Sequence, residues 1–399
     1  MKSDFKNLPS GWRVVRLGEI SSRITRRNQD NRCQNVLTIS AQSGLISQTD
    51  FFNKQVASKD LSSYILLRKG DFAYNKSYST GYSFGAFKRL KFYDEGVASP
   101  LYIYFKFNDD ICSDFFEFYF DGGQANRQIK DIVQEGARNH GLLNLSIDDF
   151  FNIKLCMPPL DEQEKIAEIL STWDDAINLT INLIENKKQF KKALMQNLLT
   201  AKIRFPEFKD EWQKIKMNDI VIEIDERSTT SNQYEILSVT LNGIVPQNTH
   251  FKKKIASQDN TGYKILRYGN LVIGMNLWMG GLDVLINKDI GIVSPAYRIF
   301  KIDDGCNMYF LKNFIKTKKM LKLYVLHSEQ GASIVRRNLN LAELLEEKIK
   351  LPNLKEQQKI AEVLTACDDE INLLNLKLEN LKKQKQGLMQ KLLNGEARV

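Results

Sequence analysis

The chain has 399 residues, 43% of them hydrophobic and 26% charged, with a formal net charge of +9. This length allows two or three domains with proper cores, and the absence of any run of about 18 apolar residues argues against a membrane span. The first residues lack the apolar segment of a signal peptide, and the positive charge favours a polyanionic partner, nucleic acid first.

Residues 1–157 are predicted to form a first domain of mixed strands and helices. It opens near Trp12, and the aromatic run Leu101–Phe107 has the composition of a buried strand. The cluster Ser79-Thr80-Gly81 marks a loop. The apolar spacing over Phe115–Ile132 predicts an amphipathic helix.

Residues 158–205 are predicted to form a long helix that starts after Pro158-Pro159. Its inward positions recur in alternating steps of four and three, the spacing of a coiled-coil seam, although lysines interrupt the second half. These positions are Ile166, Leu170, Trp173, Ile177, Thr180, Ile184, Lys187, Lys191, Leu194 and Leu198. About 40 residues of helix span roughly 60 Å.

Residues 206–351 repeat the first pattern with different residues, opening at Trp212, with strands predicted over Val284–Ile286 and Tyr297–Phe300. Met308–Leu326 is again predicted to be an amphipathic helix. Residues 352–399 are predicted to form a second long helix, preceded by Pro352 and carrying the same heptad spacing.

The two long helices are copies of one segment. Glu162–Leu170 returns as Glu356–Leu364, and the match continues at a fixed offset through Leu194-Met195-Gln196 and Leu388-Met389-Gln390. The copies lie almost half the chain apart, so the chain is a duplication and not a solenoid of short repeats.

These elements predict an α+β fold in which two mixed domains are separated by two long helices. The apolar stripe of the second helix is most simply buried by running back along the first, as an antiparallel coiled coil with a pseudo-two-fold internal repeat. In the alternatives, each helix packs on its own domain or drives homodimerisation.

Catalytic and metal-binding patterns are missing. The three histidines (His140, His250 and His327) form no zinc or metalloprotease motif, and no phosphate-binding glycine loop is present. Glu346-Glu347-Lys348 offers a Glu-x-Lys triplet without an acidic partner, and such triplets are common by chance. The five cysteines are scattered, which indicates a reducing, cytoplasmic location. An enzyme is therefore the weakest interpretation.

The arrangement resembles the specificity (S) subunit of type I restriction–modification systems. The residues that carry the resemblance are Pro159–Ala167 with Glu356–Ala361, the Leu-Met-Gln-x-Leu-Leu helix ends, the tryptophan openings, Thr200–Phe205 and an Arg-x-Gly-Asp/Asn turn in each variable domain. The second helix departs from the pattern only at its end, Leu393–Val399.

The resemblance implies a non-catalytic DNA reader in which each recognition domain reads one half of a bipartite target. The helices would set the spacing and dock two DNA adenine methyltransferase subunits, which two ATP-dependent restriction subunits could join. No cofactor is expected in this chain; S-adenosylmethionine, ATP and magnesium are expected on the partners.

Base reading needs polar side chains near a groove, and phosphate contacts need lysine and arginine. The segment after Tyr74 looks like an exposed loop, and its counterpart in the second domain is Gly274–Trp278. The DNA-binding candidates are Asn75, Lys76, Ser77, Tyr78, Lys88, Arg89, Arg138, Asn139, His140, Asn276, Trp278, Arg336, Arg337 and Asn338. The aromatic candidates could equally be structural residues.

Partner binding is assigned to residues that are identical in the two long helices and are expected to face outward. A helix face that contacts only solvent does not need to stay identical after the two halves of the chain have diverged, whereas a surface that binds two copies of one partner does. These residues are Glu162, Gln163, Lys165 and Glu168, with Glu356, Gln357, Lys359 and Glu362. Two other functions remain open: a two-headed architectural or regulatory DNA-binding protein, and a coiled-coil adaptor without a nucleic-acid role. The target bases, the gap length and whether the system cuts DNA are not encoded in any recognisable pattern.

Overall fold

The structure is a computed structural model of the chain. It describes residues 8–52, 60–77, 81–133, 143–240, 243–250, 257–274, 281–330 and 337–399, with the backbone alone for residues 330, 337 and 338. The chain divides into two compact units, Met1–Ile181 with Lys377–Val399, and Asn182–Leu376. In the described ranges, no helix is long and apolar enough to cross a membrane.

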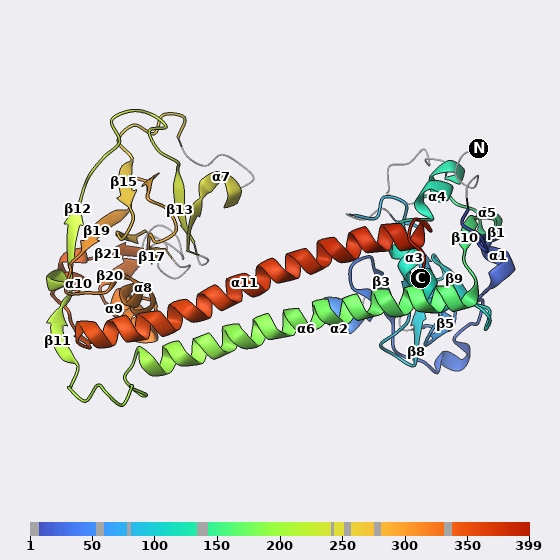
Figure 1. Ribbon diagram of the computed structural model, residues 1–399, viewed down its shortest axis with the longest axis horizontal. Helices are drawn as coiled ribbons and strands as arrows, with labels where there is room; N and C mark the ends of the chain where they lie inside the picture. The colour runs from blue at the N-terminus through green and yellow to red at the C-terminus, as the bar shows by residue number, and fades with distance from the viewer. Residues whose placement is uncertain are drawn as a thin grey trace. The chain divides into compact units, whose positions relative to one another are not determined.

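The first unit contains short strands and short helices, which Figure 1 labels. The strands are β1 (Arg13–Arg16), β2 (Ser21–Arg23), β3 (Leu37–Ser40), β4 (Gly44–Ser47), β5 (Ile65–Arg68), β6 (Phe72–Asn75), β7 (Ala86–Arg89), β8 (Glu95–Ala98), β9 (Ile103–Phe107) and β10 (Lys154–Met157). The helices are α1 (Leu17–Ile20), α2 (Gln48–Phe52), α3 (Ser113–Asp121), α4 (Asn126–Ile132) and α5 (Ile147–Phe151).

The second unit is built from a similar series. The strands are β11 (Gln213–Lys216), β12 (Val221–Ile224), β13 (Leu237–Thr240), β14 (Gly243–Pro246), β15 (Lys264–Arg267), β16 (Leu271–Ile273), β17 (Leu282–Val284), β18 (Ile290–Val293), β19 (Arg298–Ile302), β20 (Ser328–Gln330), β21 (Arg337–Leu339) and β22 (Lys348–Leu351). The helices are α7 (Gln247–His250), α8 (Met308–Phe314), α9 (Lys318–Leu326) and α10 (Leu341–Glu346).

Both units have the same sheet topology. A four-stranded antiparallel sheet has the order β2-β9-β6-β7 in the first unit and β12-β19-β16-β17 in the second. Two-stranded pairs also correspond, with β1–β10, β3–β4 and β5–β8 matching β11–β22, β13–β14 and β15–β18. The duplication detected in the helices therefore extends to the variable domains.

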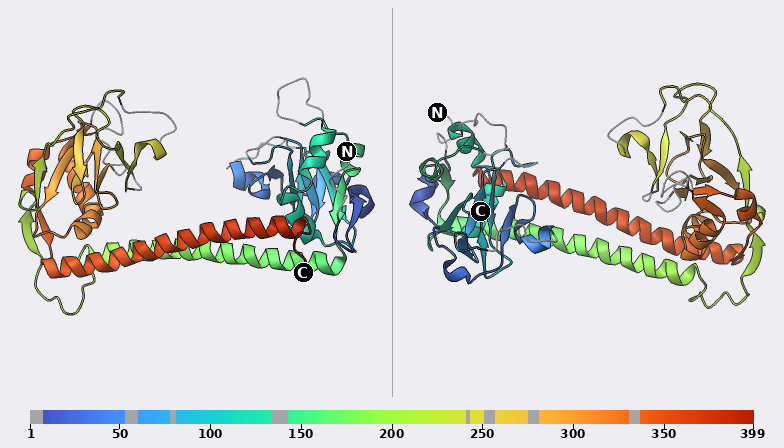
Figure 2. Two further views of the ribbon diagram at one scale, coloured as in Figure 1. Left: turned by 45° about the horizontal axis from the view of Figure 1, so that its top comes forward. Right: turned by 180° about the vertical axis from the view of Figure 1, so that it is seen from behind.

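The two long helices are α6 (Leu160–Leu198) and α11 (Leu354–Leu393). In the first unit, Ile166 and Leu170 of α6 share a buried core with Leu392 and Leu393 of α11. Figure 2 shows the end of α11 beside the start of α6 in both views. The start of one helix packs on the end of the other, so the two segments run antiparallel in this unit.

The same packing recurs in the second unit. Ile360 and Leu364 of α11 share a core with Leu198 and Leu199, at the end of α6. The predicted α+β fold, with two mixed domains and two long helices that pack together, is confirmed.

The lysines that interrupt the heptad seam pair with aspartates on the opposite helix. In the first unit Lys385 Nζ lies 2.5 Å from Asp174 Oδ1, and in the second Lys191 Nζ lies 2.5 Å from Asp368 Oδ2. Equivalent residues therefore make equivalent ion pairs in the two units. The four lysine and aspartate positions favour this antiparallel register, because any shift would separate the opposite charges.

Each predicted Arg-x-Gly-Asp/Asn segment forms a turn. Arg68 N donates to Asp71 Oδ2 at 2.8 Å, and Arg267 N donates to Asn270 Oδ1 at 3.0 Å. The intervening Gly70 has a φ of 95°, a left-handed conformation that glycine adopts without a steric penalty.

The prediction of one continuous helix in each domain was wrong. Residues 115–132 form α3 and α4, which are separated at Gly122-Gly123, and Gly123 has a φ of 80°. Residues 308–326 form α8 and α9, and the Thr317 side chain caps α9 by accepting from Met320 N. Local capping and glycine geometry override the apolar spacing at both places.

Candidate nucleic-acid interface and helix contacts

The sequence predicts that Asn75 is exposed and reads DNA, but the structure buries its side chain. It ends β6 and is buried, and its side-chain Nδ2 donates to Ile39 O at 3.3 Å while its Oδ1 accepts from Ser77 N at 2.9 Å. The preceding Tyr74 is also buried and donates its hydroxyl to Phe84 O at 2.7 Å. Asn75 and Tyr74 thus hold the start of the loop, whereas Lys76 and Ser77 are half-buried.

Lys88 and Arg89 extend from β7 toward α3, where acidic side chains neutralise them. Lys88 Nζ lies 2.7 Å from Asp121 Oδ1, and Arg89 Nη1 lies 2.6 Å from Asp114 Oδ1. Burial lowers the pKa of Lys88, but Asp121 more than offsets this effect and the pKa is raised. In this geometry Lys88 and Arg89 join the sheet to a helix and do not present free charges to phosphate.

The second domain has the opposite charge at the same place. Asp283 of β17 lies opposite Val272 of β16, and Lys88 of β7 lies opposite Ala73 of β6, so Asp283 and Lys88 occupy equivalent positions of the two sheets. Its buried carboxylate lies 2.5 Å from Lys312 Nζ and 3.0 Å from Lys316 Nζ, both on the α8 side. The two domains therefore use one scaffold with reversed charges.

Half of the DNA-binding candidates lie outside the described residues, namely Tyr78, Arg138, Asn139, His140, Asn276, Trp278 and Arg336. Arg337 and Asn338 lie in β21, opposite Gln330 and Glu329 of β20, and their side chains are also outside the described part. The role of all these residues in DNA reading stays a prediction.

The β20–β21 pair is anchored at its base by His327, the residue that precedes β20. Its Nε2 lies 2.8 Å from Glu347 Oε1, and its Nδ1 lies 3.3 Å from Glu343 Oε2. A carboxylate only accepts hydrogen bonds, so both contacts are hydrogen bonds together only when both ring nitrogens carry protons, as in the imidazolium. The hydrogen bond to Glu347, with a smaller contribution from Glu343, raises the pKa of His327.

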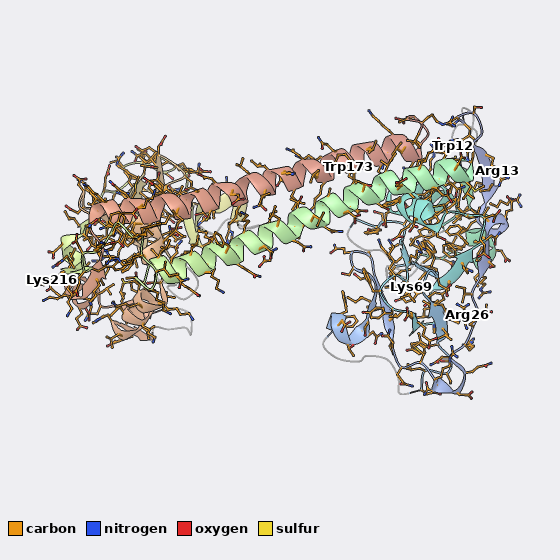
Figure 3. All side chains as sticks on the ribbon, turned by 60° about the horizontal axis from the view of Figure 1, so that its bottom comes forward. Trp12, Arg13, Arg26, Lys69, Trp173 and Lys216 are labelled. Atoms are coloured by element: carbon orange, nitrogen blue, oxygen red, sulfur yellow. The ribbon has the colours of Figure 1, made fainter. Side chains whose placement is uncertain are left out.

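Partner binding by Glu162 and Gln163 was predicted from outward-facing positions, and that orientation was wrong. Both residues are buried. Glu162 accepts from Trp12 Nε1 at 3.1 Å and from Arg398 Nε and Nη2 at 2.6 and 2.9 Å. Gln163 donates to Pro158 O at 2.9 Å and accepts from Cys112 N at 3.1 Å. Figure 3 shows Trp12 next to the start of α6.

Glu356 and Gln357 make corresponding contacts to an arginine and to a backbone N–H in the second unit and are also buried, contrary to the prediction. Glu356 accepts from Arg204 Nε and Nη2 at 2.9 and 2.7 Å, and Gln357 accepts from Asn307 N at 2.9 Å. Trp212 differs from Trp12, because its buried Nε1 has no partner among the described residues. These identities therefore recur because each helix start is tied to its own domain.

The positions of the two glutamates in the helix repeat indicate that they are buried. Glu162 lies one turn before Ile166, and Glu356 one turn before Ile360, so both lie on the seam side of their helices. Lys165, Glu168, Lys359 and Glu362 are exposed, and their role in partner binding stays a prediction.

Both helix ends also make the same turn. Lys202 N donates to Asn197 O at 3.0 Å, and Glu396 N donates to Lys391 O at 2.9 Å. Ala201 and Gly395, which precede these donors, have φ values of 56° and 71°. The different sequence after the second helix therefore preserves the position of its arginine, Arg398.

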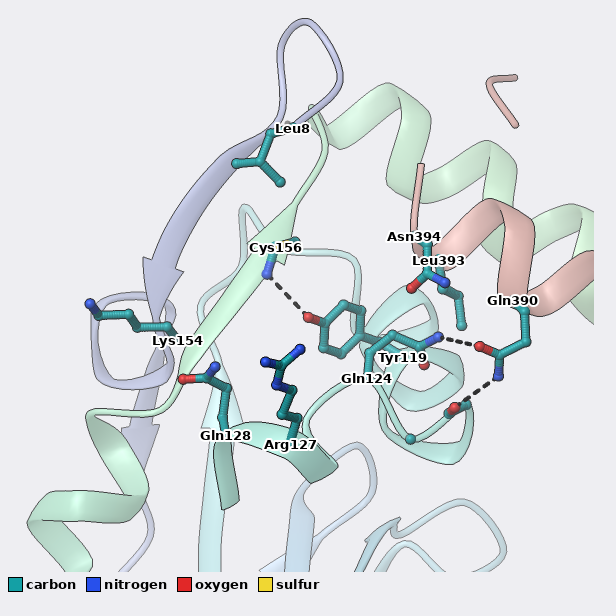
Figure 4. A pocket seen from close by; sticks show the side chains of 12 residues that line it. Leu8, Tyr119, Gln124, Arg127, Gln128, Lys154, Cys156, Gln390, Leu393 and Asn394 are labelled. Carbon is teal, nitrogen blue, oxygen red and sulfur yellow. Dashed lines mark hydrogen bonds between the residues drawn. The ribbon is translucent and has the colours of Figure 1, made fainter. Parts of the chain in front are cut away.

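A cavity of about 370 Å³ lies where the end of α11 meets the first domain, and Figure 4 shows its lining. Gln124 Nε2 donates to Gln390 Oε1 at 3.2 Å, and Gln390 Nε2 donates to Gly122 O at 3.0 Å. Tyr119 OH accepts from Cys156 N at 3.1 Å, and burial raises the pKa of Tyr119. The bonds across this cavity tie the last turn of α11 to the turn that follows α3. Among the described residues, no cluster of three histidine, cysteine or acidic side chains is suited to a metal ion.

The family model described as the type I restriction modification DNA specificity domain matches residues 9–188 and 209–383. The MjaVIII type I restriction enzyme specificity subunit of Methanocaldococcus jannaschii is 26% identical over 345 residues, which cover 76% of this chain and 75% of that protein. The HindI specificity subunit of Haemophilus influenzae is 24% identical over 195 residues, which cover 47% of this chain and 40% of that protein.

Two solved structures share the fold. The HsdS subunit from Thermoanaerobacter tengcongensis is 17% identical, with a TM-score of 0.54 and full coverage of both chains. The type I restriction–modification S subunit from M. genitalium is 11% identical, with a TM-score of 0.51 and 97% coverage of both chains.

The His327 contacts predict a pH dependence. A raised pKa in the folded state stabilises the fold fully below the unfolded value of about 6.5, and this stabilisation is lost as pH rises through the folded pKa. The melting temperature of the native chain should therefore fall relative to that of His327→Gln as pH rises above neutrality. Thermal melts at a series of pH values measure this difference, and His250→Gln serves as the control. A difference that does not change with pH would contradict the imidazolium assignment.

Proposed function

The chain belongs to the family of type I restriction–modification DNA specificity subunits and carries two recognition domains, and we propose that each domain reads one half of a split DNA target. The observation that carries this proposal is the combination of one repeated scaffold with unlike side chains. Sheet order and helix contacts agree between the units, whereas Lys88 is replaced by Asp283 and Arg26 by Glu226 at corresponding places. Unlike side chains on like scaffolds favour two different half-sites.

The helices serve as the spacer in this proposal. A helix of 39 or 40 residues is roughly 60 Å long, and one turn of DNA is about 34–36 Å. Because Gln163 and Gln357 accept hydrogen bonds from backbone N–H groups of their recognition domains, at Cys112 and Asn307, a change in helix length is transmitted to the domains. The half-sites would then be separated by bases that neither domain reads.

The chain itself has no catalytic role in this proposal and works in the cytoplasm with other subunits. Two DNA adenine methyltransferase subunits would supply S-adenosylmethionine chemistry, and two restriction subunits would use ATP and magnesium. An architectural DNA-binding protein is a less favoured function, because nothing in such a role requires both recognition domains to belong to this family.

The methyltransferase docking surface is best placed on the outer faces of α6 and α11. Leu179 is 69% exposed and Leu373 is 66% exposed, and they occupy equivalent positions of the repeat. Each leucine lies about three turns beyond the exposed Glu168 or Glu362, on the same helical face. A single exposed leucine is unremarkable on a protein surface, but its recurrence on both helices favours two copies of one partner.

Methylome sequencing of a host that carries this subunit with its methyltransferase tests the reading function. We expect methylation at an asymmetric bipartite sequence. Insertion of one matched heptad into both α6 and α11 adds about 10.5 Å, so the unread gap should grow by about 3 base pairs while the half-sites stay the same. An insertion variant that methylates with the original gap would refute the spacer role, and the absence of a bipartite motif would refute the reading function.

The docking surface predicts a change in stoichiometry. Leu179→Glu and Leu373→Glu should each remove one methyltransferase from the complex, and the double variant should remove both, because a charge prevents burial of that face. Native mass spectrometry counts the bound subunits. Leu101→Glu is the control, since Leu101 is 70% exposed but lies outside the helices. Retention of two methyltransferases by the double variant would show that they dock elsewhere.

A further inference from the structure

The two-stranded pair β11–β22 has a buried and an exposed face, and lysines occupy the whole exposed face. Ile215 lies opposite Ile349 on the inner face. On the outer face Lys214 lies opposite Lys350, and Lys216 lies opposite Lys348. We call these four lysines the lysine ribbon.

Like charges directly opposite each other on antiparallel strands destabilise the pair, since their Cβ atoms are only about 4.5–5.5 Å apart. Lys216 is compensated by Glu346, whose Oε2 lies 2.7 Å from Lys216 Nζ. Lys214, Lys348 and Lys350 are exposed and have no ion pair within the described part of the chain. The ribbon thus concentrates three uncompensated charges on one short surface.

The corresponding strands of the first unit keep part of this charge with different residues. Arg16 lies opposite Lys154 on the outer face of β1–β10, at the positions of Lys216 and Lys348, and both are exposed. Val14 and Cys156 form the other outer pair, so this copy is less basic. Figure 3 labels Lys216 of the ribbon. Positive charge is therefore kept at two of the four positions, as arginine at Arg16 and as lysine at Lys154.

The chemistry of the ribbon favours a nucleic-acid backbone over a protein. Stable protein interfaces are depleted in lysine and rely on aromatic and arginine anchors, and the outer face of the ribbon has neither. Lysine is a flexible point charge that suits phosphate contacts without base recognition. A solubility role alone would be served by mixed charges and would not require cross-strand lysine pairs.

We propose that the lysine ribbon binds phosphates of the duplex and that Arg16 and Lys154 form its weaker counterpart in the first unit. This proposal rests on the DNA-reading function and adds a contact outside the predicted reading loops. Contacts to phosphate strengthen binding to every sequence equally, so the ribbon contributes affinity and salt dependence but no specificity.

The test uses the full chain assembled with its methyltransferase. The triple variant K214Q/K348Q/K350Q leaves the Lys216–Glu346 pair intact. Duplex binding is measured over a range of salt concentrations, with a target and an unrelated sequence. We expect the salt slope to decrease by about 2 to 3, and both affinities to fall by the same factor. The corresponding arginine variant should retain the native slope, because it keeps the charge.

The matched control is K318Q/K319Q/K322Q, which removes the same charge from exposed positions of α9 in the same unit. A control that lowers the slope as much as the ribbon variant would overturn the proposal, because net charge alone would explain the effect. A ribbon variant with the native affinity and slope would also overturn it, as would loss of methyltransferase binding with DNA affinity unchanged. Failure of the native complex to bind any duplex would instead refute the reading function.

Discussion

A buried glutamate at the start of each long helix is held by an arginine just beyond the end of the other helix, and the architecture of both units depends on this contact. Glu162 is 4% exposed and Glu356 is 1% exposed, so each carboxylate needs hydrogen-bond partners to offset the cost of its burial. Arg398 and Arg204 supply bidentate hydrogen bonds. Because each contact joins the start of one helix to the residues just beyond the end of the other, it is compatible only with antiparallel packing.

The long helices and the duplication could be predicted well from the sequence, since heptad spacing over about 40 residues has few alternative interpretations. Prediction failed where tertiary contacts decide the outcome. The agreement between Glu162 and Glu356 was interpreted as a partner surface, although each glutamate lies one turn before a seam position, Ile166 or Ile360, and this spacing indicated burial. Short-range capping and glycine geometry, as at Gly123, divided helices that apolar spacing had joined.

The charged candidates in the variable domains show the same limit of sequence reasoning. Lys88 and Arg89 have the composition of phosphate contacts, but the acidic side chains of α3 that neutralise them lie 25 or more residues later in the chain. The reversed arrangement at Asp283 was equally hidden, because a strand position becomes comparable only after the register of the sheet is known. Duplication thus preserved the frame of each domain while its charged side chains diverged, which suits two readers of unlike sequences.

If each arginine stabilises only the unit in which its glutamate is buried, each single arginine variant should lower amide protection in that unit alone. Hydrogen exchange measures this protection. Arg398→Ala should remove about 1 to 2 kcal/mol locally, because the arginine is half-exposed, and should lower amide protection roughly 5- to 30-fold around Trp12 and the start of α6. Arg204→Ala should do the same around the start of α11 and leave the first unit protected. Equal loss of protection in both units from either variant, or no loss from both, would contradict the dependence of each unit on its own glutamate–arginine contact.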